Sequence, residues 1–186
     1  MYLALKFKTM ATTKWVLDPT HSEIHFKVKH LMITTVTGSF NSFTASAETE
    51  TEDFSNAAIS FSAETASVDT GNEQRDGHLT SADFFESEKF PALTFTSTGY
   101  TKKSGDEYTL TGDLTIKDVT KPVTLTVEFG GVAKDPWGNT KAGFTLSGKI
   151  NRKDFGLNWN AVTEAGGLLV SEDVKISAEI QLVKQA

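Results

Sequence analysis

The chain has 186 residues, a length that favours a single domain with a core of its own. It contains no cysteine, which excludes disulfides, thiol catalysis and cysteine-ligated metal. Its net charge is -6 and its only arginines are Arg75 and Arg152, which argues against a phosphate-backbone grip on nucleic acid.

The first segment differs from the rest of the chain. Lys6 and Lys8 interrupt the apolar run that a secretory signal would need. We therefore expect residues 1–13 to be a disordered leader or to reflect an upstream start, with Met10 as the true start and a degenerate export signal as the alternative. On this basis we expect a cytoplasmic location, with the periplasm as the alternative.

Most of the remaining chain alternates apolar and polar residues with a period of two, which is typical of strands with one dry and one wet face. The pattern predicts eight strands, at about residues 14–30, 35–48, 57–66, 92–101, 106–117, 122–134, 140–151 and 172–184. Several of the turns between them are short and rich in Pro, Gly and Asn, so neighbouring strands are expected to be antiparallel.

An apolar cluster stands where the turn between the first two strands is expected. It consists of Leu31, Met32 and Ile33. Such a turn can fold back onto the core, or it can form an exposed contact for a membrane or a partner. The sequence leaves both interpretations open.

A crossover of about 25 residues joins the third strand to the fourth, longer than most connections in a compact domain. Thr70 and Glu73 have the spacing of a capping box, so a short helix over residues 71–79 is expected, with Thr70 as its N-cap. Residues 81–85 can add a further turn of helix. Long connections are often functional, as a lid or an end plug.

An antiparallel sheet of eight strands loses its exposed edges when it closes into a barrel. We therefore predict an all-β fold: an eight-stranded antiparallel β-barrel over residues 14–186, with a short helix in the crossover between strands 3 and 4. The interior of such a barrel is either packed with side chains or holds one small ligand. A tall, narrow cavity would suit a chain-like ligand better than a compact one.

Phenylalanines recur on the predicted inner face of the strands. Each one can simply fill the core, as aromatic residues usually do. As a set they can equally line a dry, apolar tunnel. They are Phe26, Phe40, Phe61, Phe95, Phe129 and Phe144.

The sequence does not predict a metal site. His21 and His25 share a strand face but lie about 13 Å apart, too far for one ion. His25 and His30 are on opposite faces of their strand, and no pair of carboxylates supports a metal.

Arg75, Asp76 and His78 lie together on the expected helix. They can form an ordinary solvated surface, or a polar collar at the mouth of the barrel that holds a ligand head group. Ser81 with His78 and Asp76 suggests a hydrolytic triad, but the strand-turn-helix elbow that presents a nucleophilic serine is missing.

Short motifs with a fixed order run from Trp15 to Val183. They are WVLDPTHS at 15–22, FKVKH at 26–30, GSF at 38–40, NEQRDGHL at 72–79, SADFF at 81–85, GDLTI at 112–116, DPWG at 135–138 and NRKDFGL at 151–157. In this order they resemble the YceI-like family of polyisoprenoid-binding, lipocalin-like proteins. The stretch at 72–79 is the most specific.

The resemblance implies an extended, lipocalin-like barrel with an elongated pocket for a polyisoprenoid or other long-chain lipid, and often a homodimer. We expect no required cofactor; the ligand would be an isoprenoid quinone or a prenyl chain. Many members of the family are exported to the periplasm. Nucleic acid is not expected as a partner, whereas transient membrane contact is compatible with the sequence.

The expected binding site is the apolar lumen, with candidate head-group contacts at Arg75, Asp76 and His78. No catalytic residue is predicted. The expected lumen residues are Phe26, Val28, Phe40, Phe61, Leu79, Phe84, Phe85, Phe95, Leu114, Phe129, Phe144, Leu146 and Trp159.

The leading hypothesis is non-catalytic binding, storage or transport of a long-chain lipid, driven by burial of its chain. One alternative is an enzyme that acts on a lipid held in the barrel, with His78 or Asp76 as the base. The other is a stress-related interaction module in which the barrel interior is only a packed core.

Overall fold

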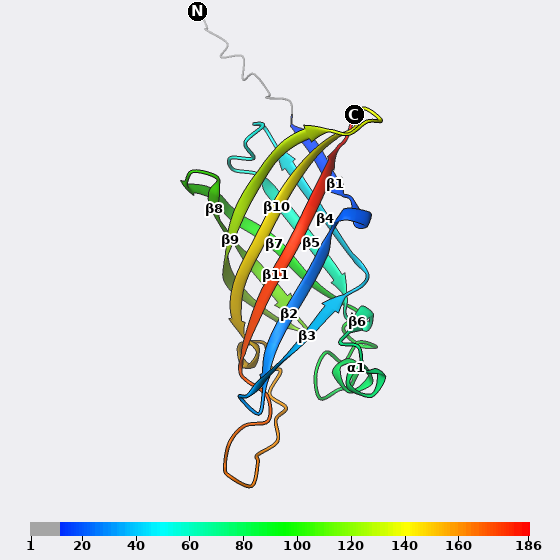
Figure 1. The fold of residues 1–186 in the computed structure, drawn as a ribbon, viewed down its shortest axis with the longest axis vertical. Helices are drawn as coiled ribbons and strands as arrows, with labels where there is room; N and C mark the ends of the chain where they lie inside the picture. The colour runs from blue at the N-terminus through cyan, green and yellow to red at the C-terminus, as the bar shows by residue number, and fades with distance from the viewer. Residues whose placement is uncertain (1–11) are drawn as a thin grey trace, which may run out of the picture.

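The alternating segments form long antiparallel strands that close into an elongated barrel (Figure 1). The computed structural model describes residues 12–186. Residues 1–11 of the predicted leader therefore lie outside the described residues. The predicted start at Met10 is among them. The first strand begins at Thr13.

Eight strands make the closed ring, in the order β1-β4-β5-β7-β8-β9-β10-β11, and pairing of β1 with β11 completes it. This confirms the predicted eight-stranded antiparallel barrel. Three further strands, β2 (Glu23–His30), β3 (Thr34–Phe40) and β6 (Val68–Asp69), continue the sheet from β11. The ring strands are β1 Thr13–Leu17, β4 Phe43–Thr49, β5 Ala58–Glu64, β7 Ala92–Ser104, β8 Glu107–Ile116, β9 Val119–Lys134, β10 Thr140–Asn151 and β11 Asp173–Lys184.

The first two predicted strands are each broken in two. A 3-10 helix at Pro19–His21 separates β1 from β2, because proline has no N–H to donate to a sheet ladder. Asp18 caps this helix by accepting a hydrogen bond from the Thr20 N–H at 3.1 Å. The second predicted strand is interrupted after Phe40, so that β3 pairs with β2 whereas β4 pairs with β1.

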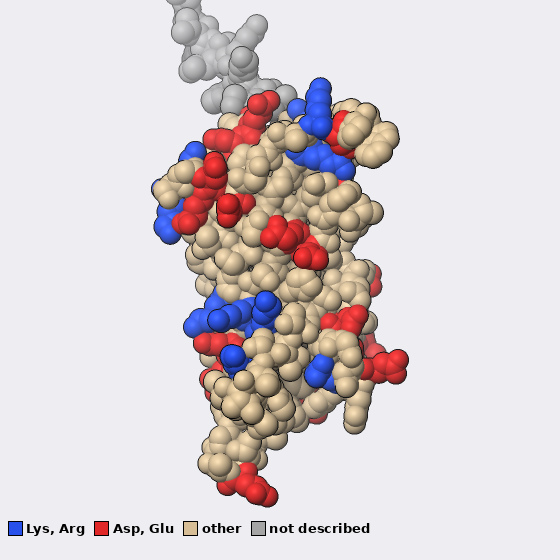
Figure 2. Space-filling view, viewed as in Figure 1, with Lys and Arg blue, Asp and Glu red and all other residues tan. Residues whose placement is uncertain are grey.

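The two ends of the barrel are built from different segments (Figure 1). The upper end in the figure carries the β4–β5 loop, the β7–β8 and β9–β10 turns and the C-terminus. The lower end carries the β2–β3 turn, helix α1 (Glu73–Thr80) and the connection between β10 and β11, which begins with a 3-10 helix at Arg152–Phe155. The lower end also presents much uncharged surface (Figure 2). Within residues 12–186, no helix has the length and apolar character needed to span a bilayer.

The predicted crossover helix is present, with a different N-terminus. Its N-cap is Asn72, whose side-chain oxygen accepts a hydrogen bond from the Arg75 N–H at 2.9 Å. Thr70, the expected cap, instead donates its N–H to the carboxylate of Asp76 at 2.9 Å. The prediction was wrong because both residues are good caps and the spacing to Glu73 favoured the earlier one.

Residues 81–85 form turns and add no helix. The Phe85 N–H donates to the Leu79 carbonyl at 2.9 Å and the Ser87 N–H to the Thr80 carbonyl at 3.0 Å, so the chain reverses directly after α1. This reversal buries Phe84 and Phe85.

Candidate functional site

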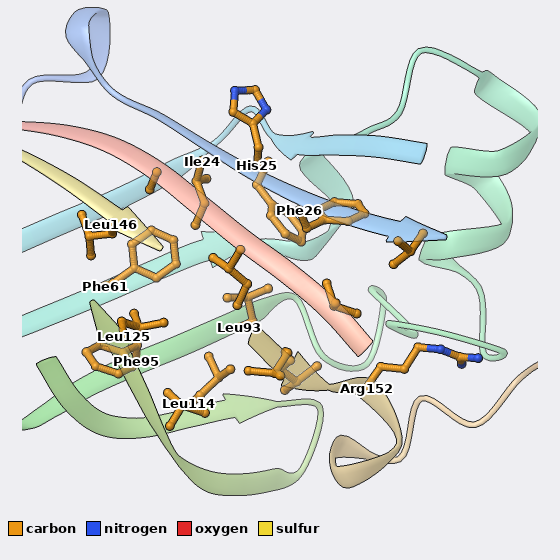
Figure 3. Close-up of a pocket in the computed structure, with 18 of the residues that line it drawn as sticks. Ile24, His25, Phe26, Phe61, Leu93, Phe95, Leu114, Leu125, Leu146 and Arg152 are labelled. Carbon is orange, nitrogen blue, oxygen red and sulfur yellow. The ribbon is translucent and has the colours of Figure 1, made fainter. Parts of the chain in front are cut away.

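A cavity of about 1020 Å³ runs inside the barrel. Its wall is apolar and is built by β2 to β5 and β7 to β11. In the close-up, Phe61, Phe95 and Leu114 point from different strands into one common space (Figure 3). The volume lies at the upper end of the roughly 300–1,000 Å³ range of pockets that hold small molecules. The interior is therefore a preformed pocket and not a filled core.

The residues predicted to line the lumen border this cavity, with one exception. Their contact with a ligand remains a prediction. The predicted lumen residues that do border the cavity are Phe26, Val28, Phe40, Phe61, Leu79, Phe84, Phe85, Phe95, Leu114, Phe144, Leu146 and Trp159.

The exception is Phe129, which lies beyond the upper end of the cavity. Its ring packs against Phe54, Tyr108 and Phe144, with ring centroids 5.7, 6.3 and 5.3 Å away. Phe54, which does border the cavity, stands between the space and Phe129. Phe129 is therefore corrected from a wall residue to an end residue. The alternation of apolar and polar residues predicts that Phe129 points inward, but it does not predict its position along the barrel axis.

An aromatic plug closes the upper end; it consists of Trp15, Phe54, Tyr100, Tyr108 and Phe129. Trp15 and Phe54 are 3% and 1% exposed, and their ring centroids lie 4.9 Å apart. Tyr100 and Tyr108 stack with centroids 4.7 Å apart. Burial raises the pKa of the Tyr100 hydroxyl, so it stays neutral. The plug therefore closes the interior of the barrel at this end.

Sequence reasoning missed Phe54, because it lies in the loop between β4 and β5 and not in a strand. Its neighbour Asp53 holds that loop by accepting hydrogen bonds from the Thr51 hydroxyl at 2.7 Å and from the Ser55 N–H at 3.0 Å. These bonds lower the pKa of Asp53 to about 2. The only available signal was a lone aromatic residue in an otherwise acidic and polar loop.

Two rings of the cavity wall lie flat because a glycine faces each of them. A Cβ on Gly38 would overlap the ring of Phe26 on the paired strand. A Cβ on Gly112 would overlap the ring of Phe95 in the same way. Both glycines therefore keep a bulky ring against the wall and out of the open space.

Polar groups border the cavity mainly at its lower end, where α1 lies. Arg75 is exposed and donates from Nε to the Thr70 hydroxyl at 2.7 Å and from Nη2 to the Thr70 carbonyl at 2.8 Å. Arg75 and His78 both border the cavity. Asp76 does not, because its carboxylate turns toward Thr70, so we withdraw it as a candidate head-group contact.

His78 is fixed in place by aromatic and acidic neighbours. Its ring packs edge-on against Phe84 and Trp159, with centroids 5.1 and 4.6 Å away, and Nε2 lies 2.8 Å from the carboxylate of Asp83. Ser81 donates its hydroxyl to the His78 backbone carbonyl at 2.7 Å. The structure therefore does not assemble Ser81, His78 and Asp76 into a triad. Within residues 12–186, no three acidic or histidine side chains are placed to hold a metal ion.

Arg152 is a second residue whose role sequence reasoning missed. It is 3% exposed and borders the cavity. It donates to the carbonyls of Ser171, Trp159 and Val170 at 2.9, 2.8 and 3.4 Å, and also to that of Leu157. Burial lowers its pKa, but an arginine remains charged in proteins. Arg152 thus ties the β10–β11 connection across the lower end.

Similarity to known proteins agrees with this architecture. A UPF0312 protein of Staphylococcus aureus strain MSSA476 is 39% identical over 170 residues, which cover 91% of this chain and 96% of that protein. The crystal structure of a Campylobacter jejuni YceI protein is 35% identical with a TM-score of 0.72, covering 91% of this chain and 97% of that one.

Two more distant structures share the fold. Burkholderia cenocepacia BcnA has a TM-score of 0.75 at 23% identity, covering 89% of this chain and 98% of its own. A polyisoprenoid-binding domain from Saccharophagus degradans has a TM-score of 0.68 at 16% identity, covering 92% and 98%. The model of the YceI-like domain matches residues 15–182. The chain therefore belongs to the YceI-like family.

Proposed function

We propose that the barrel binds one long-chain lipid, a polyisoprenoid or a chain of similar shape, inside its cavity. The observation that carries this proposal is the preformed apolar cavity of about 1020 Å³, which ends at the aromatic plug. Apolar burial contributes roughly 25 cal/mol for each Å² removed from water. A long chain that fills the space gains this along its whole length.

The direction of the bound lipid follows from where the polar groups stand. The plug is aromatic, whereas Arg75 and His78 border the cavity near α1. The chain end then lies against the plug, and the head group lies beside α1. A polyisoprenoid ligand is supported by the name of the Saccharophagus degradans domain, which shares this fold.

Non-catalytic carriage or storage fits the site better than catalysis. His78 already faces Asp83, and the Ser81 hydroxyl faces a backbone carbonyl. A general base needs a reacting group within hydrogen-bond reach, and the described residues at the cavity mouth supply no activated nucleophile. A homodimer and a cytoplasmic location remain predictions.

Native mass spectrometry of the purified protein tests this function. We expect a retained lipid whose mass matches an extracted isoprenoid. Adding a long-chain isoprenoid alcohol to delipidated protein should raise the unfolding temperature, since a ligand that binds only the folded state stabilises it. Absence of any retained lipid, together with an unchanged unfolding temperature, would contradict the proposal. A lipid whose mass changes during incubation with the protein would favour an enzyme.

A further inference from the structure

Five exposed apolar side chains gather at the lower end of the barrel, and we call them the apolar tip. They come from two segments far apart in the sequence. The Leu31 N–H donates to the Leu169 carbonyl at 2.8 Å, and His30 forms a β-bridge with Val170, so the two segments are joined. The tip residues and their exposed fractions are Leu31 40%, Met32 61%, Ile33 76%, Val162 73% and Leu168 38%.

The β2–β3 turn places bulky apolar residues in a backbone conformation that such residues rarely adopt. Leu31 and Met32 have φ values of 51° and 59°, and the Ile33 N–H donates to the His30 carbonyl at 3.1 Å. Positive φ at both central residues is the requirement of a tight hairpin turn that normally takes Asn-Gly. Bulky apolar residues in such strained positions are a sign of function and not of folding.

A row of lysines lies on the outer surface above the tip. Lys149, Lys175 and Lys27 are direct neighbours across β10, β11 and β2. Only Lys149 of these three has a close acidic partner among the described residues, Asp173 at 2.9 Å. One group of basic side chains lies just below the middle of the face shown in Figure 2, with acidic side chains beside it and further basic ones near the upper end. The row is therefore a local basic feature on a chain whose net charge is -6.

The lysine row is close enough to act together with the tip. Counted along β2, Lys27 lies about 13 Å from Leu31, and Lys29 lies about 7 Å from it. An apolar surface inserts about 5–10 Å into a bilayer interface, so lysines at these heights would stand near the level of the lipid head groups. Glu164, in the β10–β11 connection between Val162 and Leu168, is an opposing charge at this end.

The cavity and the tip share the same end of the barrel. Thr34, next to Ile33, borders the cavity, and so do Leu169 and Val170, next to Leu168. A surface that combines shallow apolar insertion with nearby lysines matches the interface of a bilayer that contains anionic lipids. A membrane is also where a long-chain lipid would be taken up or released.

We propose that the apolar tip docks onto a bilayer containing anionic lipids and holds the lower end of the cavity against it. The lysine row then faces the anionic head groups. This inference rests on the proposed lipid binding, because docking gives the cavity a source and a destination for its lipid.

The first test measures co-flotation with phosphatidylcholine vesicles that contain phosphatidylglycerol. The double variant Leu31→Asn/Met32→Gly installs the residues that the turn prefers, so it should fold at least as well as the wild type. We expect its vesicle affinity to fall roughly tenfold or more, since two exposed apolar side chains are lost. The matched control is Trp137→Ala, which removes a side chain that is 84% exposed at the opposite end and should change nothing.

The second test separates charge from apolar contact. Lys27→Glu/Lys175→Glu should abolish the preference for phosphatidylglycerol over pure phosphatidylcholine vesicles, together with its salt dependence. Lys134→Glu/Lys184→Glu makes the same change in net charge at the ends of β9 and β11 and should keep the preference. Equal loss in both double variants would overturn a local role for the lysine row.

Native mass spectrometry of the same variants distinguishes docking from lipid binding. Tip variants that retain lipid but no longer float with vesicles support the proposal. A Leu31→Asn/Met32→Gly variant that floats like the wild type overturns it, whether or not lipid is retained. A change in oligomeric state by light scattering, with unchanged flotation, also overturns it and identifies the tip as a contact between subunits.

Discussion

The two ends of the barrel use apolar side chains in opposite ways. At the upper end, Trp15 and Phe54 are buried against each other and close the interior. At the lower end, Met32 and Ile33 are exposed, and Arg152 ties a loop across the barrel through backbone carbonyls. The aromatic residues of the upper end therefore serve to stabilise the fold. The lower end keeps apolar groups in water, and the proposed membrane docking gives these groups a partner.

The largest expected effect compares the plug with the cavity wall. Phe54→Ala should lower the free energy of unfolding by about 3–5 kcal/mol, the usual loss for a packed core aromatic residue. Phe61→Ala should cost less in the lipid-free protein. Both rings border the cavity, but Phe61 is only partly buried, whereas Phe54 is 1% exposed and packs against three other rings. Denaturant unfolding of both variants measures the difference.

Phe144 sharpens this comparison, since it borders the cavity but also packs 4.9 Å from Phe54 and 5.3 Å from Phe129. Phe144→Ala should therefore resemble Phe54→Ala more than Phe61→Ala. Equal losses for Phe54→Ala and Phe61→Ala would show that the wall is packed like the plug, and the open cavity would be wrong.

The next effect concerns the lower end. Arg152→Met should cost about 2–3 kcal/mol, because several carbonyls lose a charged donor together. Hydrogen exchange should rise in residues 157–171 and stay unchanged at the plug. Arg152→Lys should rescue little, since an ammonium group cannot reproduce the planar guanidinium fork. Increased exchange over the whole barrel would mean that Arg152 supports the entire fold and not the lower end alone.

A smaller effect tests the glycines of the wall. Gly112→Ala should cost about 1–3 kcal/mol, because the new methyl group overlaps both the Phe95 ring and the backbone carbonyl of Thr96. It should also weaken binding of a long isoprenoid in a fluorescence titration. The control is Gly77→Ala in α1, where no atom lies within 4 Å of the added Cβ. That change should raise stability by roughly 0.5–1 kcal/mol. Unchanged lipid affinity in Gly112→Ala would place the ligand away from Phe95.

The smallest effect near neutral pH is that of the carboxylates at the upper end, whose contribution to stability is lost only in acid. Hydrogen bonds from Lys141 and Thr20 hold the pKa of Asp18 far below its ordinary 3.8, and Thr51 and Ser55 lower that of Asp53 to about 2. A lowered folded pKa stabilises the protein above about pH 4 and loses this contribution as the pH falls. Unfolding midpoints between pH 5 and pH 2 should drop less steeply for Asp18→Asn than for the wild type. Parallel curves would contradict this role of Asp18.

Strand-forming patterns made much of this architecture predictable. Phe61 and Phe95 stand in clean period-two runs, so their inward direction followed from the sequence. Alternation repeats every two residues along a strand, but it carries no information about where a cavity ends. Phe129 was placed in the wall for that reason.

The missed residues act through contacts that are distant in the sequence or lie outside regular elements. Phe54 reaches the plug from a loop, and Arg152 binds carbonyls up to 19 positions away. A motif can mark such an arginine without revealing its partners. The choice between Thr70 and Asn72 as the cap was settled by Asp76, which engages Thr70.

The interruption of the second strand has a mechanical consequence. Below it, β3 no longer follows β4 toward β5 and is joined only to the two-residue β6 on that side, through Ser39 with Asp69 and Phe40 with Val68. On this side, therefore, β3 can separate from β6 without breaking a hydrogen bond of the eight-strand ring, whereas a separation of β4 from β5 would break that ring.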